Sequence, residues 1–241
     1  MLHVFVETNW VFAVAAPAHH KLPDAVELLE RARNNSVQLH VPSPCLTEAR
    51  QPIMTRCQPR HEANAIRQFL LWSRSLGTIS AEQDAVTREV LDRFEQQVRA
   101  ELRRLDDFIR GLKTEAGVDV YALNEHMLSK SIDLAEMNLG LKPFDQAILG
   151  AVLGRAEELR ARGETDLCFC EMDADLQPWD KNGDAKQPLT ELYDRAGVLG
   201  VPRFQSHFAR TAAGLAGQRQ RRVKSALRII RCAFESSVVT L

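Results

Sequence analysis

The sequence predicts an α/β protein with a mainly parallel central sheet that is covered by helices on both faces. Short apolar runs typical of buried strands alternate along the chain with segments of helical periodicity. This order of elements produces parallel sheets whose strands are joined by helical crossovers. At 241 residues, the chain is long enough for one sizeable core with an elaborated insertion.

Four strands are predicted from apolar runs, at residues 2–6, 37–41, 167–170 and 198–204. Helices between them are predicted from capping residues and apolar periodicity, at residues 10–16, 23–35, 143–162 and 189–196. A further helix is expected to start at Ser43-Pro44, because Ser is a good N-cap and Pro a good first helical residue. In the helix that begins at Pro143, Gly150 and Gly154 are expected to permit close approach of a neighbouring element.

Residues 60–137 contain no strand signal, and we interpret them as an inserted helical hairpin. Pro52 and Pro59 are expected to break the chain before this insertion. A long amphipathic helix is then predicted at residues 83–113, with an apolar stripe typical of a core or of a groove for a partner helix. A further helix is predicted at residues 121–137.

The formal net charge of −1 conceals an asymmetry between the end of the chain and the rest. From Phe208 onward the charges sum to +6, so the other 207 residues sum to −7. A basic tail can bind nucleic acid or an acidic partner, but it also fits a solvated helix face. We interpret residues 1–207 as one domain with the helical insertion, and residues 208–241 as a basic helical tail.

Composition and cysteine usage indicate a cytoplasmic protein without a membrane partner. The longest apolar runs are far too short to cross a bilayer. The N-terminal segment lacks the basic region of a secretory signal and reaches an acid at Glu7. The five cysteines are an odd number and include no CxxC pair, which fits a reducing compartment.

Acidic residues from separate parts of the chain are expected to converge at one edge of the sheet. Glu7 ends the first strand, and Glu48 lies in the first turns of the helix after the second strand. Asp145 lies in the first turn of a later helix, and Asp173 and Asp175 follow a buried strand. Ligands bind beyond the carboxyl ends of such strands. Clustered carboxylates repel one another unless a cation neutralises them, so the sequence predicts a site for Mg²⁺ or Mn²⁺.

The order and context of these acids resemble the PIN-domain nucleases. The matching positions are Glu7 in Glu-Thr-Asn, Glu48, Asp145 in KPFDQAILGAVLG and Asp173 in MDADL. The segment LYDRAGVLGV also resembles the family's last helix and strand. Glu7 stands where the family usually has Asp, and Glu171 stands where it often has Thr or Ser. The resemblance covers about residues 1–55 and 140–205, with the helical insertion between.

The resemblance implies metal-dependent hydrolysis of phosphodiester bonds, usually in RNA, with water as the nucleophile. Glu7, Glu48, Asp145 and Asp173 would be the catalytic and metal-organising carboxylates, and Asp175 a fifth or supporting metal ligand. Thr8 and Asn9 would hold Glu7 in place or meet phosphate. Besides the RNA substrate, the resemblance leaves room for an antitoxin or another protein partner, as in the toxin half of a toxin–antitoxin pair, and for a homo-oligomer.

Two other functions remain open. An acid pair such as Asp173 and Asp175 after an apolar strand is how many nucleotide-sugar glycosyltransferases bind Mn²⁺, although that function leaves the other three acids unused. A non-catalytic PIN-like scaffold that binds nucleic acid or protein is favoured by the departures at Glu7 and Glu171.

Other residues near the predicted site have plainer interpretations. His19 and His20 are adjacent on a loop, and we expect them to be exposed and to point apart. Trp179 is expected to pack against its loop rather than to stack on a base. The basic residues near the predicted edge are Arg50, Lys142 and Arg203, which are expected to be solvated surface residues.

Overall fold

A five-stranded parallel sheet forms the centre of the molecule. The computed structural model describes residues 1–202, except for the side chains of His61 and Pro202; the predicted tail at 208–241 and Arg203 lie outside this range. Within it, the strands are β1 (Leu2–Val6), β2 (Val37–Pro42), β3 (Val118–Tyr121), β4 (Leu167–Glu171) and β5 (Val198–Pro202). Their order is β3-β2-β1-β4-β5, and every neighbouring pair is parallel. The predicted α/β class and parallel sheet are therefore confirmed.

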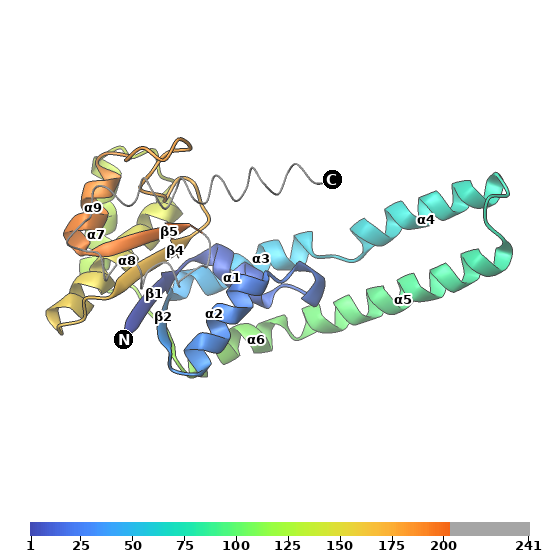
Figure 1. Ribbon diagram of the computed structural model, residues 1–241, viewed down its shortest axis with the longest axis horizontal. Helices are drawn as coiled ribbons and strands as arrows, with labels where there is room; N and C mark the ends of the chain where they lie inside the picture. The colour runs from blue at the N-terminus through green and yellow to red at the C-terminus, as the bar shows by residue number, and fades with distance from the viewer. Residues whose placement is uncertain (203–241) are drawn as a thin grey trace.

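Helices cover both faces of this sheet. On one side lie α1 (Thr8–Ala15), α2 (Pro23–Arg33) and α3 (Ser43–Arg56), as Figure 1 shows. On the other side lie α7 (Glu125–Glu136), α8 (Pro143–Ala161) and α9 (Leu189–Ala196). A short 3₁₀ helix, η1 (Ala18–His20), joins α1 to α2. Within residues 1–202, no helix combines the length and the apolar character needed to span a membrane.

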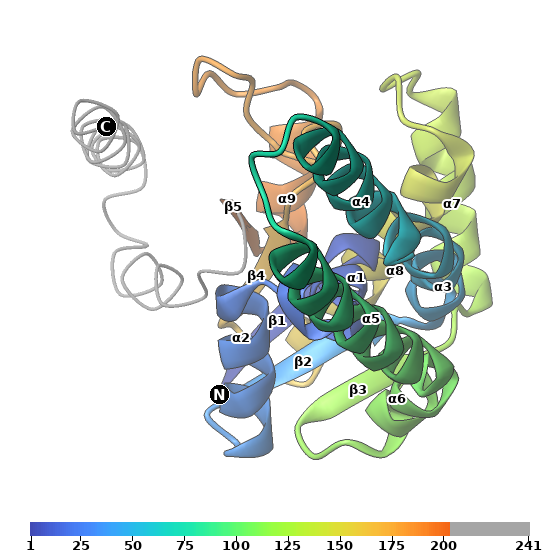
Figure 2. The same cartoon turned by 90° about the vertical axis from the view of Figure 1, so that its right-hand side faces the viewer.

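Two long helices of the insertion form an arm that extends away from this body. They are α4 (Arg60–Ser75) and α5 (Ala81–Arg103), seen from the side in Figure 1 and nearly end-on in Figure 2. A capping box starts α5: the Ser80 hydroxyl accepts a hydrogen bond from the Gln83 N–H, and the Gln83 side chain accepts one from the Ser80 N–H. α6 (Leu105–Gly111) and η2 (Leu112–Thr114) return the chain to the body.

The core lies between the sheet and the helices packed on it. All five residues of β1 and all five of β4 are buried. On the far side, α7 packs so closely on α8 that a Cβ at Gly150 would lie 2.9 Å from the Met127 carbonyl oxygen and 2.9 Å from the Ser131 nitrogen. At Gly154, a Cβ would lie 2.8 Å from the Met127 side chain. The close approach expected at these two glycines is confirmed.

The prediction of a strand-free insertion was wrong at β3. This four-residue strand pairs with β2, with Leu39 opposite Val118 and Val41 opposite Val120. It forms the edge of the sheet and is too short to give a clear apolar run. The helix predicted from residue 121 begins instead at Glu125, where the Asn124 side chain accepts a hydrogen bond from the Met127 N–H.

Two helix boundaries also differ from the prediction. α3 continues through Pro52 to Arg56, because the buried side chains of Ala49 and Ile53 keep the helix packed on the body. The long helix predicted at residues 83–113 ends at Arg103, and α6 follows it. Only part of its apolar stripe is core, since Val86 and Val90 near the tip of the arm are 57% and 60% exposed.

A chain of polar side chains fastens β3 to the rest of the sheet. His3 Nδ1 lies 2.9 Å from His40 Nε2, and His40 Nδ1 lies 2.9 Å from Asp119 Oδ2. Arg155 on α8 donates to the same Asp119 oxygen at 2.7 Å. Because an ionised carboxylate only accepts, His40 carries a proton on Nδ1 and donates it to Asp119. The hydrogen bonds from His40 and Arg155 lower the pKa of Asp119 to about 2.

Candidate functional site

The candidate site lies where the strand order reverses. From β1 the chain builds outward to β2 and β3, and it then returns to place β4 and β5 on the other side of β1. In open parallel sheets, ligands bind at the carboxyl ends of the two strands that flank this switch point. Glu7 directly follows β1, and Asp173 lies just after the end of β4. Both acids therefore stand at the place where this kind of sheet binds ligands.

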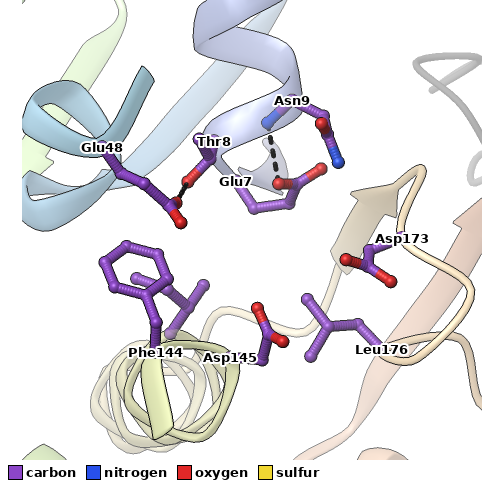
Figure 3. Close-up of a pocket in the computed structure, with 9 residues that line it drawn as sticks. Glu7, Thr8, Asn9, Glu48, Phe144, Asp145, Asp173 and Leu176 are labelled. Carbon is purple, nitrogen blue, oxygen red and sulfur yellow. Dashed lines mark hydrogen bonds between the residues drawn. The ribbon is translucent and has the colours of Figure 1, made fainter. Parts of the chain in front are cut away.

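A pocket of about 100 Å³ opens at this point, and Figure 3 shows its lining residues. The predicted residues that line it are Glu7, Thr8, Asn9, Glu48, Asp145 and Asp173. Phe144, Ile148 and Leu176 complete the lining. Four of these nine described residues are acids and none is basic. The fold thus brings four carboxylates from separate segments to one small space.

Glu7 is buried at the N-terminus of α1 and is 4% exposed. Its Oε2 accepts a hydrogen bond of 2.7 Å from the Asn9 N–H and so caps the helix. Its Oε1 is buried and has no hydrogen-bond partner in the described structure. Burial raises the pKa of Glu7 from 4.5 to about 7, against the opposing effect of hydrogen bonds from Asn9 and Met172, and the negative charge of Asp173 raises it further.

Glu48 reaches the same pocket from α3. The Thr8 hydroxyl donates a hydrogen bond to Glu48 Oε2, which links α1 to α3 on one side of the pocket (Figure 3). Glu48 is exposed, so solvent reaches its carboxylate. Thr8 therefore orients Glu48, whereas the sequence had assigned it to Glu7 or to phosphate.

Asp145 lies in the first turn of α8, where a carboxylate interacts favourably with the helix dipole. Its Oδ2 is buried without a hydrogen-bond partner among the described residues. Burial raises the pKa of Asp145, and the negative charge of Asp173 raises it further, while Lys142 acts in the opposite direction. Asp145 and Asp173 are therefore close enough to feel one another's charge, although they come from different elements.

Asp173 and Asp175 have different surroundings. Asp173 lines the pocket, and its Oδ1 accepts a hydrogen bond of 2.8 Å from the Asp175 N–H. The Asp175 side chain is exposed and does not line the pocket. Its charge still acts on Asp145, whose pKa it raises. Asp175 thus contributes a backbone N–H that orients Asp173, and its carboxylate stands outside.

Glu171 is fully buried beneath the pocket, at the end of β4. The Tyr193 hydroxyl oxygen lies 3.0 Å from Glu171 Oε2 and 2.8 Å from the Leu176 carbonyl oxygen. A phenol has one proton, so it satisfies both neighbours only if it donates to the carbonyl and accepts from a protonated Glu171. Burial raises the pKa of Glu171 well above its usual value, which agrees with this assignment. Burial and the single proton of the phenol therefore both favour the protonated form of Glu171.

The pocket's donors fit a hard divalent cation. All candidate ligands are carboxylate oxygens, and two of them, Glu7 Oε1 and Asp145 Oδ2, are buried without partners in the part of the chain described. The pocket carboxylates do not form a compact cluster of three donor atoms within 4.8 Å of one another. Mg²⁺ commonly keeps several waters and takes only one or two protein carboxylates directly.

Four other residues singled out in the sequence have defined contacts in the structure. Arg50 forms a two-point ion pair with Asp106, with N–O distances of 2.6 and 2.9 Å. Trp179 was expected to pack against its own loop; it forms a β-bridge with Ala185 of that loop, and its ring also packs on β5, since a Cβ at Gly200 would lie 2.9 Å from it. The prediction that His19 and His20 point apart was wrong, because their ring centroids are 4.1 Å apart and both rings face the same carboxylate.

Three pocket residues, and the tyrosine that contacts Glu171, were not predicted from the sequence. Phe144 and Ile148 share α8 with Asp145, and Leu176 follows Asp173 by three positions, so helix and turn geometry offered a signal for them. Tyr193 offered none, because it looks like any apolar residue of an amphipathic helix.

No protein-family model matches the chain, and no curated protein and no solved structure matches it either.

Proposed function

We propose that the protein hydrolyses phosphodiester bonds in RNA with the help of Mg²⁺ or Mn²⁺, as a PIN-like endoribonuclease. The observation that carries this proposal is the convergence of Glu7, Glu48, Asp145 and Asp173 on one pocket that no basic residue lines. Acids from four separate segments would repel one another there without a cation. Their order along the chain, which resembles that of the acids in PIN-domain nucleases, supports the PIN-like assignment.

The residues have separable roles in this proposal. Glu7, Asp145 and Asp173 would hold the cation. The Glu48 carboxylate would face the same cation from α3. A bound divalent cation would activate water and neutralise the charge that develops on the phosphate. The Asn9 and Asp175 N–H groups each hold one oxygen of an acid, which fixes the direction of the other oxygen. The Thr8 hydroxyl does the same for Glu48.

The position of Asp175 disfavours the glycosyltransferase alternative. A transferase of that kind would use Asp173 and Asp175 together on one Mn²⁺, whereas here only Asp173 lines the pocket. Such a transferase would also have no use for Asp145, whose unpartnered oxygen is buried at the same pocket. The nuclease proposal uses both features. Only a measurement of RNA cleavage distinguishes a non-catalytic scaffold from the proposed nuclease.

The test is a cleavage assay with labelled RNA and single-stranded DNA, run with Mg²⁺, with Mn²⁺ and with chelator. We expect metal-dependent cleavage of RNA by the full chain and its loss in Asp145→Asn. Asp133→Asn is the matched control, because Asp133 is exposed on α7 and does not line the pocket. If a folded protein that binds Mn²⁺ cuts neither substrate, the scaffold function replaces the nuclease. If Asp145→Asn cuts as fast as the control, the proposed site is wrong.

A further inference from the structure

A second cluster of metal-ligating side chains lies at the base of the arm. His19 and His20 come from η1, and Glu62 comes from the first turn of α4. Their donor atoms all lie within 4.8 Å of one another. Among the residues that the structure describes, these three make up the one group of this kind. The cluster contains no residue of the acidic pocket, so it stands independently of the proposed function.

The distances in this cluster fit one tetrahedral ion. His19 Nε2 lies 3.5 Å from Glu62 Oε2, and His20 Nε2 lies 3.2 Å from Glu62 Oε1. Zinc binds imidazole nitrogen and carboxylate oxygen at about 2.0–2.2 Å, so two ligands at a tetrahedral angle are about 3.3 Å apart. Both nitrogen–oxygen separations are thus close to those of ligands on one zinc ion, with each histidine nearest a different oxygen of Glu62. The donor atoms of the two histidines lie within 4.8 Å of each other.

The ligand types select the class of metal. Two imidazoles and one carboxylate suit Zn²⁺ and similar transition ions, whereas Mg²⁺ prefers oxygen ligands alone. The side chains of His19, His20 and Glu62 are 30%, 35% and 45% exposed, so an ion and a completing water can reach them from solution.

Contacts from the second arm helix hold the same segment in place. The Ala18 N–H donates a hydrogen bond of 2.7 Å to Glu101 on α5. The His19 ring packs edge-on against Phe94 of α5, with ring centroids 5.1 Å apart. The histidine pair therefore lies on a short helix that α5 fixes from one side and Glu62 of α4 meets from the other.

We propose that His19, His20 and Glu62 bind one Zn²⁺-class ion, which clamps the base of the arm to the connection between α1 and α2. Ion pairs this exposed contribute little to stability, so Glu62 by itself holds the two histidines weakly. One carboxylate shared by two adjacent imidazoles is better explained by a cation that all three bind. The ion would set the angle at which the arm leaves the body.

Zinc titration of the full-length protein tests this proposal. The protein is first treated with chelator to remove bound metal and is then titrated in a buffer with Mg²⁺, so that Mg²⁺ rather than Zn²⁺ occupies the acidic pocket. Calorimetry should give one Zn²⁺ per chain, and Co²⁺ should give the visible bands of a tetrahedral site. His20→Ala and Glu62→Gln should each weaken binding at least tenfold. His126→Ala is the matched control, because His126 is also exposed and pairs with one glutamate, Glu157, at 3.0 Å.

Hydrogen exchange with and without Zn²⁺ tests the clamp itself. Zn²⁺ should slow exchange in the first turn of α4 and in η1 of the wild type, and this protection should be lost in Glu62→Gln. Circular dichroism shows whether each variant is folded, which is expected because all three side chains are partly exposed. Equal zinc affinity in the wild type, His20→Ala and Glu62→Gln would overturn the site. Tight binding without protection of α4 would overturn the clamp.

Discussion

The hydroxyl of Thr8 donates a hydrogen bond to the carboxylate of Glu48, a residue 40 positions further along the chain. Thr8 begins α1 and Glu48 lies in α3, so this bond fixes the two helices on one side of the acidic pocket relative to each other. The bond engages one of the two carboxylate oxygens of Glu48, Oε2. The orientation of this acid is therefore set by a neighbour that itself carries no charge.

Thr8→Val removes this hydrogen bond with little change in side-chain volume. We expect RNA cleavage to fall by about tenfold, because groups that orient metal-binding carboxylates typically contribute 10- to 100-fold. The measurement is the single-turnover cleavage rate at saturating Mg²⁺. Thr47→Val is the control, since the Thr47 hydroxyl bonds only the Pro44 carbonyl oxygen and lies outside the pocket. Equal rates in the two variants would remove Thr8 from the site.

Tyr193→Phe should destabilise the fold from beneath the pocket. The variant leaves the Glu171 carboxyl and the Leu176 carbonyl without their shared partner, and one unsatisfied buried group costs about 1–3 kcal/mol. Urea unfolding measures this loss. Glu171→Gln should cost much less at neutral pH, because an amide can donate to the Tyr193 oxygen as the protonated carboxyl does. If Glu171→Gln is the more damaging of the two, Glu171 is ionised in the folded protein.

Glu7→Gln should change how stability depends on pH. The pKa of Glu7 is about 7 in the folded protein against an ordinary value of 4.5, so folding favours the protonated form. The corresponding stabilisation is complete below pH 4.5 and is lost as the pH rises through 7, by about 3 kcal/mol in all. The free energy of unfolding of the wild type, measured in chelator, should therefore fall relative to Glu7→Gln across this range. A constant difference from pH 4 to 8 would contradict a Glu7 whose pKa is raised by burial.

Gly150→Ala should destabilise the packing of α7 on α8. The added methyl group would lie 2.9 Å from two backbone atoms of α7, which cannot move aside as a side chain would. We expect a loss of about 1–3 kcal/mol in thermal or urea unfolding. Gly111→Ala is the matched comparison: nothing lies within 4 Å of its added Cβ, so this helical position should gain up to about 1 kcal/mol. Two variants of equal stability would show that the helices are not in close contact.

The sequence predicted the buried centre of the fold and the residues of the pocket well, for a physical reason. Strands β1 and β4 are buried on both faces, so all of their residues except His3 and Glu171 are apolar, and the pattern is clear. The acids at their carboxyl ends stand out against that background. Parallel strand order then forces Glu7 and Asp173 to the same edge.

What the sequence did not predict depends on contacts between distant segments. β3 is a four-residue edge strand, held by pairing with β2 and by the bond between Asp119 and His40. Pro52 stays inside α3 because burial of its neighbours outweighs the lost backbone hydrogen bond. His19 and His20 converge because Glu62, 42 positions beyond His20, faces both rings. None of these features leaves a local pattern in the chain.

The central claim is that acids from separate elements act as one metal-dependent site, and a double-mutant comparison of RNA cleavage tests it most directly. Asp145→Asn, Asp173→Asn and the double variant would be assayed in single-turnover reactions at saturating Mn²⁺. We expect each single variant to lose at least about 100-fold, and the double variant to be no slower than the worse single one, because residues that act as a unit are strongly non-additive. Near wild-type cleavage by either single variant would contradict the account.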